Sequence, residues 1–161
     1  MADKNYLTRL GYKRIIDEMM ALTTDERPHI VREVATAAAE GDRSENSAYI
    51  YGKKRLREID RRLTFLKKRL RSAEVVDRPA KTPTKIVFGV TVDVEDEEGD
   101  TKVYRIVGVD EVDLKRGDIS WKSPVGKALL GKKKGDAVTL QTAGGERELV
   151  VLKIRWVEPT A

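Results

Sequence analysis

The sequence predicts an α+β protein, in which an N-terminal antiparallel α-helical coiled-coil hairpin precedes a small, mainly antiparallel β domain with one short helix. Apolar residues recur at helical spacing from Thr8 to Ser72, and the apolar period becomes two after a junction that contains two prolines. Charged residues make up 37% of the 161 residues and aromatic residues 6%, which favours elongated, solvated surface over one large core. We expect a hairpin domain at residues 1–76 and a β domain at residues 77–161.

The first helix is expected from Thr8, a plausible N-cap, to Glu40, with Gly41 ending it. Pro28 interrupts the apolar pattern, so it either begins a restarted helix or marks a kink. The apolar positions of this helix are Ile15, Ile16, Met19, Met20, Leu22, Ile30, Val34, Ala37 and Ala38.

The second helix is expected from Ser44 to Ser72. Its apolar residues are spaced 3, 4, 3 and 4 apart, which is the heptad pattern of a helix that pairs lengthwise with another helix. The first helix is the obvious partner, across the short turn EGDRS. A helix of this length extends for roughly 43 Å. The residues of this seam are Leu56, Ile59, Leu63, Leu66 and Leu70.

The β domain begins after the segment VVDRPAKTPTK. Strands are expected in VTVDVED and KVYRIVGVDEVD around the turn EEGD, and a short strand in DISW. SPVGKALLG reads as a short helix with Pro124 near its first turn. DAVTLQT, the turn AGGE and RELVVLKIRWVE form a final hairpin.

Composition excludes several classes of site. The chain contains no cysteine, which excludes disulfides and thiolate chemistry, and its single histidine, His29, cannot build a metal cluster. No apolar run approaches the roughly 20 residues of a membrane span, and the N-terminus lacks the apolar core of a signal peptide. We therefore expect a cytoplasmic protein. The net charge of +5 favours an acidic partner such as nucleic acid.

The turn between the helices carries two acidic residues, Asp42 and Glu45, for which two interpretations are open. Asp42 could cap the second helix with Glu45 in its third position, or Ser44 could cap it with Glu45 in the first turn. Alternatively, the two carboxylates could share a divalent cation such as Mg²⁺. An exposed pair holds such an ion weakly, so the site of a partner would have to supply the remaining ligands, as in two-metal phosphoryl transfer.

A one-sided basic surface follows the turn, and we call it the basic band. At about 100° per residue, its six residues fall within roughly 100° on one side of the leucine seam. A face made for solubility normally mixes both signs, so this band predicts contact with a phosphate backbone. Its residues are Lys53, Lys54, Arg57, Arg61, Lys68 and Arg71.

Three further arginines, Arg55, Arg62 and Arg69, recur every seven residues on the other side of the seam. We expect them to pair with acids of the first helix. Examples of such acids are Asp17, Glu18 and Glu33.

Several motifs in order resemble the bacterial Gre transcript cleavage factors, and most closely the GreB branch. GDRSEN with a following Tyr49 resembles the hairpin tip of that family, and KKRLREIDRR its extended basic patch. FGVTVDVED, YRIVGVDEVD and ISWKSPVGKALLGKKKGD resemble segments of its C-terminal domain. One departure is Lys122, where relatives often carry Asp or Asn before Ser-Pro.

The resemblance implies an FKBP-like C-terminal domain that docks on RNA polymerase while the hairpin enters the secondary channel. It implies that Asp42 and Glu45 help to hold a catalytic Mg²⁺ shared with the polymerase site, with no tightly bound cofactor. Ser44, Asn46 and Tyr49 would support the tip, and the basic band would contact the 3′ end of backtracked RNA. Ser120, Ser123 and Pro124 would contact polymerase. The protein is then a monomeric activator of polymerase, without catalytic activity of its own.

Three other functions remain open. A channel-binding inhibitor of polymerase needs no carboxylate pair of this type, so Asp42 and Glu45 argue against it. A prolyl isomerase needs a pocket lined by aromatic residues, and the β domain contains few aromatic residues after Phe88. An FKBP-like fold alone does not imply that function. The last alternative is a generic RNA-binding coiled-coil protein.

Overall fold

The computed structural model describes residues 4–41 and 45–158. These residues form two compact units. One unit comprises Tyr12–Ser72, and the other combines the chain up to Gly11 with the chain from Ala73 onward. Within the described ranges, no helix is both long and apolar enough to cross a membrane.

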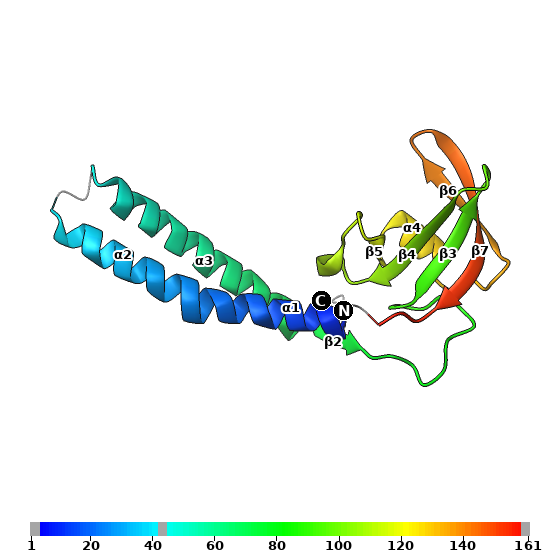
Figure 1. Ribbon diagram of the computed structural model, residues 1–161, viewed down its shortest axis with the longest axis horizontal. Coiled ribbons are helices and arrows are strands. Elements are labelled where there is room, and N and C mark those ends of the chain that lie inside the picture. Colours follow the sequence, from blue (N-terminus) through cyan, green and yellow to red (C-terminus); the bar gives the residue numbers. More distant parts are fainter. Residues whose placement is uncertain (1–3, 42–44, 159–161) are drawn as a thin grey trace. The chain divides into compact units, whose positions relative to one another are not determined.

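The first of these units is a pair of long helices that lie side by side (Figure 1). One arm runs through α1 (Arg9–Met20), the π-helical segment η1 (Ala21–Glu26) and α2 (Arg27–Ala39), and the other arm is α3 (Ser47–Arg71). The predicted seam is confirmed, since Ile59, Leu63 and Leu66 are buried and Leu56 and Leu70 are half-buried. The helical hairpin expected from the heptad spacing is therefore the observed fold.

The π-helical segment explains how Pro28 fits into a continuous helical arm. Buried residues of this arm occur at Ile15, Leu22, Ile30 and Ala37, so the middle interval holds one residue more than a heptad. A π-helical turn accommodates an extra residue and keeps the apolar positions on one face. Pro28 lies in the first turn of α2, where its missing N–H and fixed φ are tolerated. The expected first-turn position of Pro28 is observed, but the helical arm continues through it from η1 without a break.

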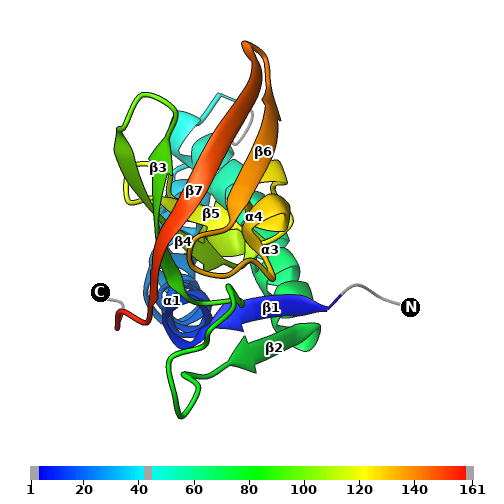
Figure 2. The same ribbon diagram turned by 90° about the vertical axis from the view of Figure 1, so that its right-hand side faces the viewer.

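The second unit is built on a five-stranded sheet with strand order β5-β4-β3-β7-β6 (Figure 2). The strands are β3 (Thr91–Asp96), β4 (Thr101–Val107), β5 (Asp118–Ser120), β6 (Ala137–Thr142) and β7 (Gly145–Arg155), and the helix is α4 (Pro124–Leu129). All pairings are antiparallel except β4 with β5, which is parallel. The predicted strands and the short helix α4 are confirmed, except that the strand expected in KVYRIVGVDEVD ends at Val107 and is followed by the short helical turn η2 (Val109–Glu111). The sheet is mainly antiparallel, as expected.

The core of this unit is almost entirely aliphatic. Alternate residues of β3 point inward, and the buried Val92 and Val94 pack with Ile106, Leu129 and Val151. Gly89 lies at the edge of this core with φ of +90°, and a Cβ there would come within 2.9 Å of the Trp156 ring. The close packing of Trp156 therefore requires glycine at this position.

A two-stranded parallel ribbon, not expected from the sequence, joins β1 (Asn5–Thr8) to β2 (Ala73–Val76). β1 is held further by Glu111 of η2 (Val109–Glu111), whose carboxylate accepts hydrogen bonds from the Thr8 hydroxyl, from Thr8 N at 3.0 Å and from Gly108 N at 2.8 Å. Glu111 is buried, so these donors satisfy its charge. The ribbon therefore groups with the C-terminal sheet, whereas the predicted domain 1–76 placed it with the hairpin.

Candidate nucleic-acid interface

The start of α3 is fixed by Asn46. Its side-chain Oδ1 accepts a hydrogen bond from Tyr49 N at 3.1 Å, and its Nδ2 donates one to Ala37 O, at the end of α2, at 2.9 Å. The backbone of Asn46 is extended, as an N-cap requires. The predicted caps at Asp42 and Ser44 are therefore wrong, because α3 begins at Ser47 and Asn46 already satisfies its first turn.

The predicted carboxylate pair lies partly inside the described residues. Glu45 is exposed and precedes the N-cap, so its carboxylate is not part of the helix. Asp42 and Ser44 lie outside the described residues. Tyr49, in the first turn of α3, is half-buried. Because Asn46 starts the helix, Glu45 remains available for another role.

All six residues of the basic band are exposed on α3. Within residues 4–41 and 45–158, no ion pair involves any of the six. Arg61 makes a long hydrogen bond, 3.4 Å, from its Nε to Arg57 O of its own helix. The charges of the band are thus directed to solvent, where a polyanion can reach them.

Other basic side chains of the hairpin are used between its two arms. Arg62 donates to both carboxylate oxygens of Glu18, at 2.7 and 2.9 Å, which confirms one predicted pair. Arg55 binds Glu26, another acid of the first helical arm, at 2.6 Å from its Nε, as the expected pairing with that arm requires. The hydrogen bonds to Glu26 and Glu58, together with their charges, raise the pKa of the Arg55 guanidinium above its usual value. These arginines connect the arms, in contrast to the basic band.

The predicted polymerase contacts lie in the turn that leads into α4, whose first residue is Pro124. Ser123 Oγ caps α4 by accepting from Gly126 N at 3.0 Å, and it donates to Ser120 O at 2.6 Å. Ser120 Oγ accepts from Lys122 N at 3.1 Å. Both serines therefore hold the turn, while Pro124 is exposed and the Nζ of Lys122 lies 5.2 Å from the centroid of the Trp121 ring. Of the predicted contacts, Pro124 presents the most surface to a partner.

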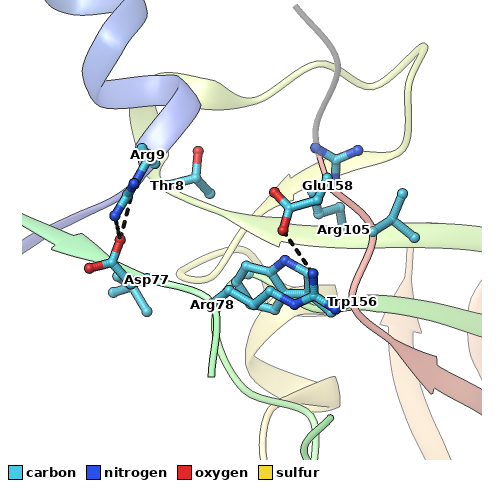
Figure 3. Close-up of a pocket in the computed structure, with 10 residues that line it drawn as sticks. Thr8, Arg9, Asp77, Arg78, Arg105, Trp156 and Glu158 are labelled. Carbon is cyan, nitrogen blue, oxygen red and sulfur yellow. Dashed lines mark hydrogen bonds and ion pairs between the residues drawn. The ribbon is translucent and has the colours of Figure 1, made fainter. Parts of the chain in front are cut away.

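A pocket of about 250 Å³ lies between the ribbon and the C-terminal end of β7 (Figure 3). Arg9 binds Asp77 across it at 2.6 Å, and Arg78 binds Glu158 at 3.2 Å. The third arginine, Arg105, is 3.6 Å from the buried Asp118. Because each arginine has an acidic neighbour, the pocket carries no excess charge for a phosphate ligand.

An exposed acidic cluster occupies the turn between β3 and β4. One oxygen each of Asp96, Glu98 and Asp100 lies within 4.8 Å of the others. Asp96 Oδ1 accepts hydrogen bonds from the backbone N of Glu98 and of Asp100, both at 2.9 Å. The Asp96 carboxylate therefore stabilises the turn. Sequence reasoning did not single out this cluster, although the run EDEEGD is visible in the sequence.

Sequence reasoning also missed the functions of Asn46 as a cap and of Glu111 as an anchor. The segment ENSAY contains the signal for the first, since asparagine is among the best N-cap residues. No local pattern indicates the second, because Glu111 and Thr8 are 103 residues apart.

Two family models match the chain. Residues 5–75 match the model described as transcription elongation factor, N-terminal, and residues 81–156 match transcription elongation factor, GreA/GreB, C-term. The transcription elongation factor GreB of Haemophilus influenzae is 50% identical over 98% of this chain and 99% of its own length. GreB of Yersinia pestis is 48% identical over 97% of this chain and 91% of its own length. The solved structure of the transcription factor Gfh1 is 27% identical, covers 96% of this chain and 99% of its own, and has a TM-score of 0.45. The matches to both halves of the chain and the near full-length relatives show that this chain belongs to the GreA/GreB family of transcription elongation factors.

Proposed function

We propose that this protein binds RNA polymerase and stimulates the cleavage of backtracked RNA by the active site of polymerase, which rescues arrested elongation complexes. The observation that carries the proposal is the order of features along α3: an exposed carboxylate, Glu45, precedes the helix, and an exposed basic band follows it. Membership of the GreA/GreB family identifies polymerase as the partner. The protein acts as a monomer and has no catalytic activity alone.

The carboxylate end of the hairpin is proposed to enter the secondary channel of polymerase. Glu45 offers hard oxygen ligands of the kind that Mg²⁺ prefers, and Asp42 is its proposed partner. Two carboxylates leave most of the six Mg²⁺ positions open, so the aspartates of polymerase and water complete the site. A Mg²⁺ ion held there would supply activation of the attacking water. Asp42 and Glu45 would contribute negative charge and help to hold the ion in place.

The basic band is proposed to guide the extruded 3′ end of the RNA. The six cations of the basic band have no acidic partner among the described residues, so they can neutralise the charges of successive phosphates. The arginines between the arms, such as Arg62, keep α3 in position instead. Phosphate contacts orient a nucleic acid without reading its sequence, so this surface accepts any transcript.

The C-terminal unit is proposed to dock on polymerase through the turn that begins α4. Ser120 and Ser123 shape this turn by their internal hydrogen bonds, and Pro124 provides exposed surface. Lys122 adds a cation next to Trp121. We expect the complementary surface of this organism's polymerase to be acidic at that point.

The first experiment measures shortening of 3′-extruded, end-labelled RNA in a stalled, backtracked elongation complex. Wild-type protein is expected to restore extension, whereas Asp42→Asn and Glu45→Gln lose at least ten-fold in cleavage rate, by about 1.4 kcal/mol or more in the barrier. Binding to polymerase should change little in both variants. Glu40→Gln, which removes an exposed carboxylate at the other side of the turn, is the matched control and should cleave normally.

Three results would contradict the proposal. Normal cleavage by both variants would show that the carboxylates of Asp42 and Glu45 have only a local structural role. Slower elongation without any cleavage by the wild-type protein would identify an inhibitor of polymerase instead. Binding to RNA with no binding to polymerase would identify a generic RNA-binding protein.

A second experiment concerns the basic band. Reversing charge at Arg57 and Arg61 is expected to slow cleavage most on long backtracks, where more extruded RNA lies along α3. The rates are compared on complexes backtracked by few and by many nucleotides. Equal loss on both would count against RNA guidance by this surface.

A further inference from the structure

The basic band has an exposed aromatic ring at its edge. Phe65 is 44% exposed on α3, and at about 100° per residue it lies roughly 20° from Lys54 around the helix axis. Along the helix it follows Arg61 by four residues and precedes Lys68 by three, so all three share one surface. The ring therefore lies beside the charges that are available to phosphates.

The position of the Phe65 ring is supported from one side. The guanidinium carbon of Arg62 is 5.2 Å from the ring centroid, a cation–π distance. Arg62 is itself held by the bidentate bonds to Glu18 at 2.7 and 2.9 Å. The contacts from Glu18 to Arg62 and from Arg62 to Phe65 thus restrict the motion of the Phe65 ring, while a large part of the ring surface remains exposed to solvent.

The surroundings of the ring suit a flat, partly polar ligand. Phe65 lines a shallow hollow with Glu58, Arg61 and Arg62. Ile50, which is 51% exposed, lies nearer the tip at about 40° from Lys54, within the band itself. Single exposed apolar side chains are ordinary, but here a ring that Arg62 contacts from one side is combined with a one-sided row of cations. Proteins that bind single-stranded nucleic acids combine these two elements.

We propose that Phe65, with Arg61 beside it, is a stacking platform for one unpaired nucleobase of RNA whose phosphates contact the basic band. The inference rests on the proposed function of that band and adds a base contact to it. Stacking on an aromatic ring tolerates every base because each has a π face. The platform would therefore retain the RNA without restricting its sequence.

The test compares two probes of equal length and charge in a binding titration with the full-length protein. One is a fluorescein-labelled oligoadenylate, and the other has the same ribose-phosphate backbone without bases. Phe65→Leu, which keeps an apolar side chain and removes the ring, should weaken binding of oligoadenylate about ten-fold and leave the abasic probe unchanged. Phe65→Tyr should bind both as wild type. Arg61→Ala should weaken both probes, because it removes charge.

A location measurement complements the titration. An oligonucleotide with 5-iodouridine at one position is irradiated in the complex, and the cross-linked peptide is identified by mass spectrometry. We expect cross-links at Phe65 that are lost in Phe65→Leu, with thermal unfolding showing both proteins folded. Cross-links confined to other residues, or equal affinity of wild type and Phe65→Leu for oligoadenylate, would overturn the platform.

The two proposals fail in different ways. If Arg57→Glu and Lys54→Glu leave the affinity for both probes unchanged, the basic band itself does not bind RNA and the platform is refuted with it. If these variants weaken binding and Phe65→Leu does not, the band remains and only the stacking contact is refuted.

Discussion

Asn46 has two separable hydrogen-bonding functions, and this makes it the most informative single residue of the tip. Asn46→Ala removes the acceptor for Tyr49 N and the donor to Ala37 O together. We expect a loss of about 1 kcal/mol or somewhat more in the free energy of unfolding. Asn46→Ser keeps a capping oxygen and lacks the amide, so it should lie between Ala and wild type. Urea unfolding followed by circular dichroism measures the differences. Equal stability of all three would show that the cap is unimportant.

Glu111 is the residue on which the position of β1 depends most. Glu111→Ala leaves the backbone N–H groups of Thr8 and Gly108 without their acceptor. We expect a loss on the order of 3 kcal/mol in the free energy of unfolding. Glu98→Ala, which removes an exposed carboxylate from a turn of the same unit, is the control and should change stability by less than about 0.5 kcal/mol. Faster hydrogen exchange at residues 5–8 in Glu111→Ala alone would locate the effect, and unchanged exchange would contradict it.

At the scale of elements, the π-helical segment η1 gives a prediction about chain length. Deletion of Thr24 converts the interval between Leu22 and Ile30 into a regular heptad, so the seam stays in phase. We expect the melting temperature to fall by no more than a few degrees. Deletion of Thr36, an exposed residue in regular α-helix, is the matched control and moves Ala37 out of the seam. A Thr24 deletion as destabilising as the Thr36 deletion would refute this explanation of η1.

The ion pair between α2 and α3 makes the hairpin sensitive to acid. Arg27 Nε lies 2.9 Å from Asp60 Oδ1, and its hydrogen bond lowers the pKa of the Asp60 carboxyl below its usual value. A lowered pKa means that the pair stabilises the folded state above the unfolded-state pKa, near 3.9, and that this contribution is lost as pH falls through the folded-state pKa.

The measurement compares wild type with Asp60→Asn in urea at several pH values from 6 down to 2. The stability advantage of wild type should be constant at the higher pH values and shrink toward zero in the acid range. An advantage that does not change with pH would show that Asp60 acts through packing or another uncharged contact.

Elements with a strong apolar period could be predicted from the sequence, and elements defined by distant partners could not. The seam from Leu56 to Leu70 and the strands β3, β4, β6 and β7 follow from spacing alone. The ribbon could not be predicted, because β1 and β2 have four residues each and Asn5 pairs with Ala73. The prediction of the α3 cap was wrong for a related reason. Asp42, Ser44 and Asn46 have similar capping preferences, and the position of Ala37 O decides among them.

The charge of the whole molecule is strongly divided along the chain. α3 carries ten Lys and Arg and two Asp and Glu, a net charge of +8, while the whole chain has +5. The rest of the chain is therefore net acidic, at −3. Long-range attraction of RNA thus depends on one helix rather than on the overall charge.

This division predicts the salt dependence of RNA binding. If all six cations of the basic band contact phosphates, the logarithm of the association constant should fall with the logarithm of salt concentration with a slope of about −4 for a single strand. Each cation replaced by alanine should make the slope shallower by about 0.7. Lys115→Ala, an exposed cation of the other unit, should leave the slope unchanged. A slope near zero would exclude phosphate contacts as the source of affinity.

The bond from Asn46 to Ala37 O also has a consequence for the order in which the hairpin folds. Ala37 O accepts from Glu40 N at 3.2 Å as well, so one carbonyl at the end of α2 is shared with the residue that initiates α3. Nucleation of α3 at its N-terminus is then cooperative with termination of α2. The amide of Tyr49, protected by Asn46, becomes a probe of this closure: its exchange with deuterium should report opening of the hairpin end before the seam separates.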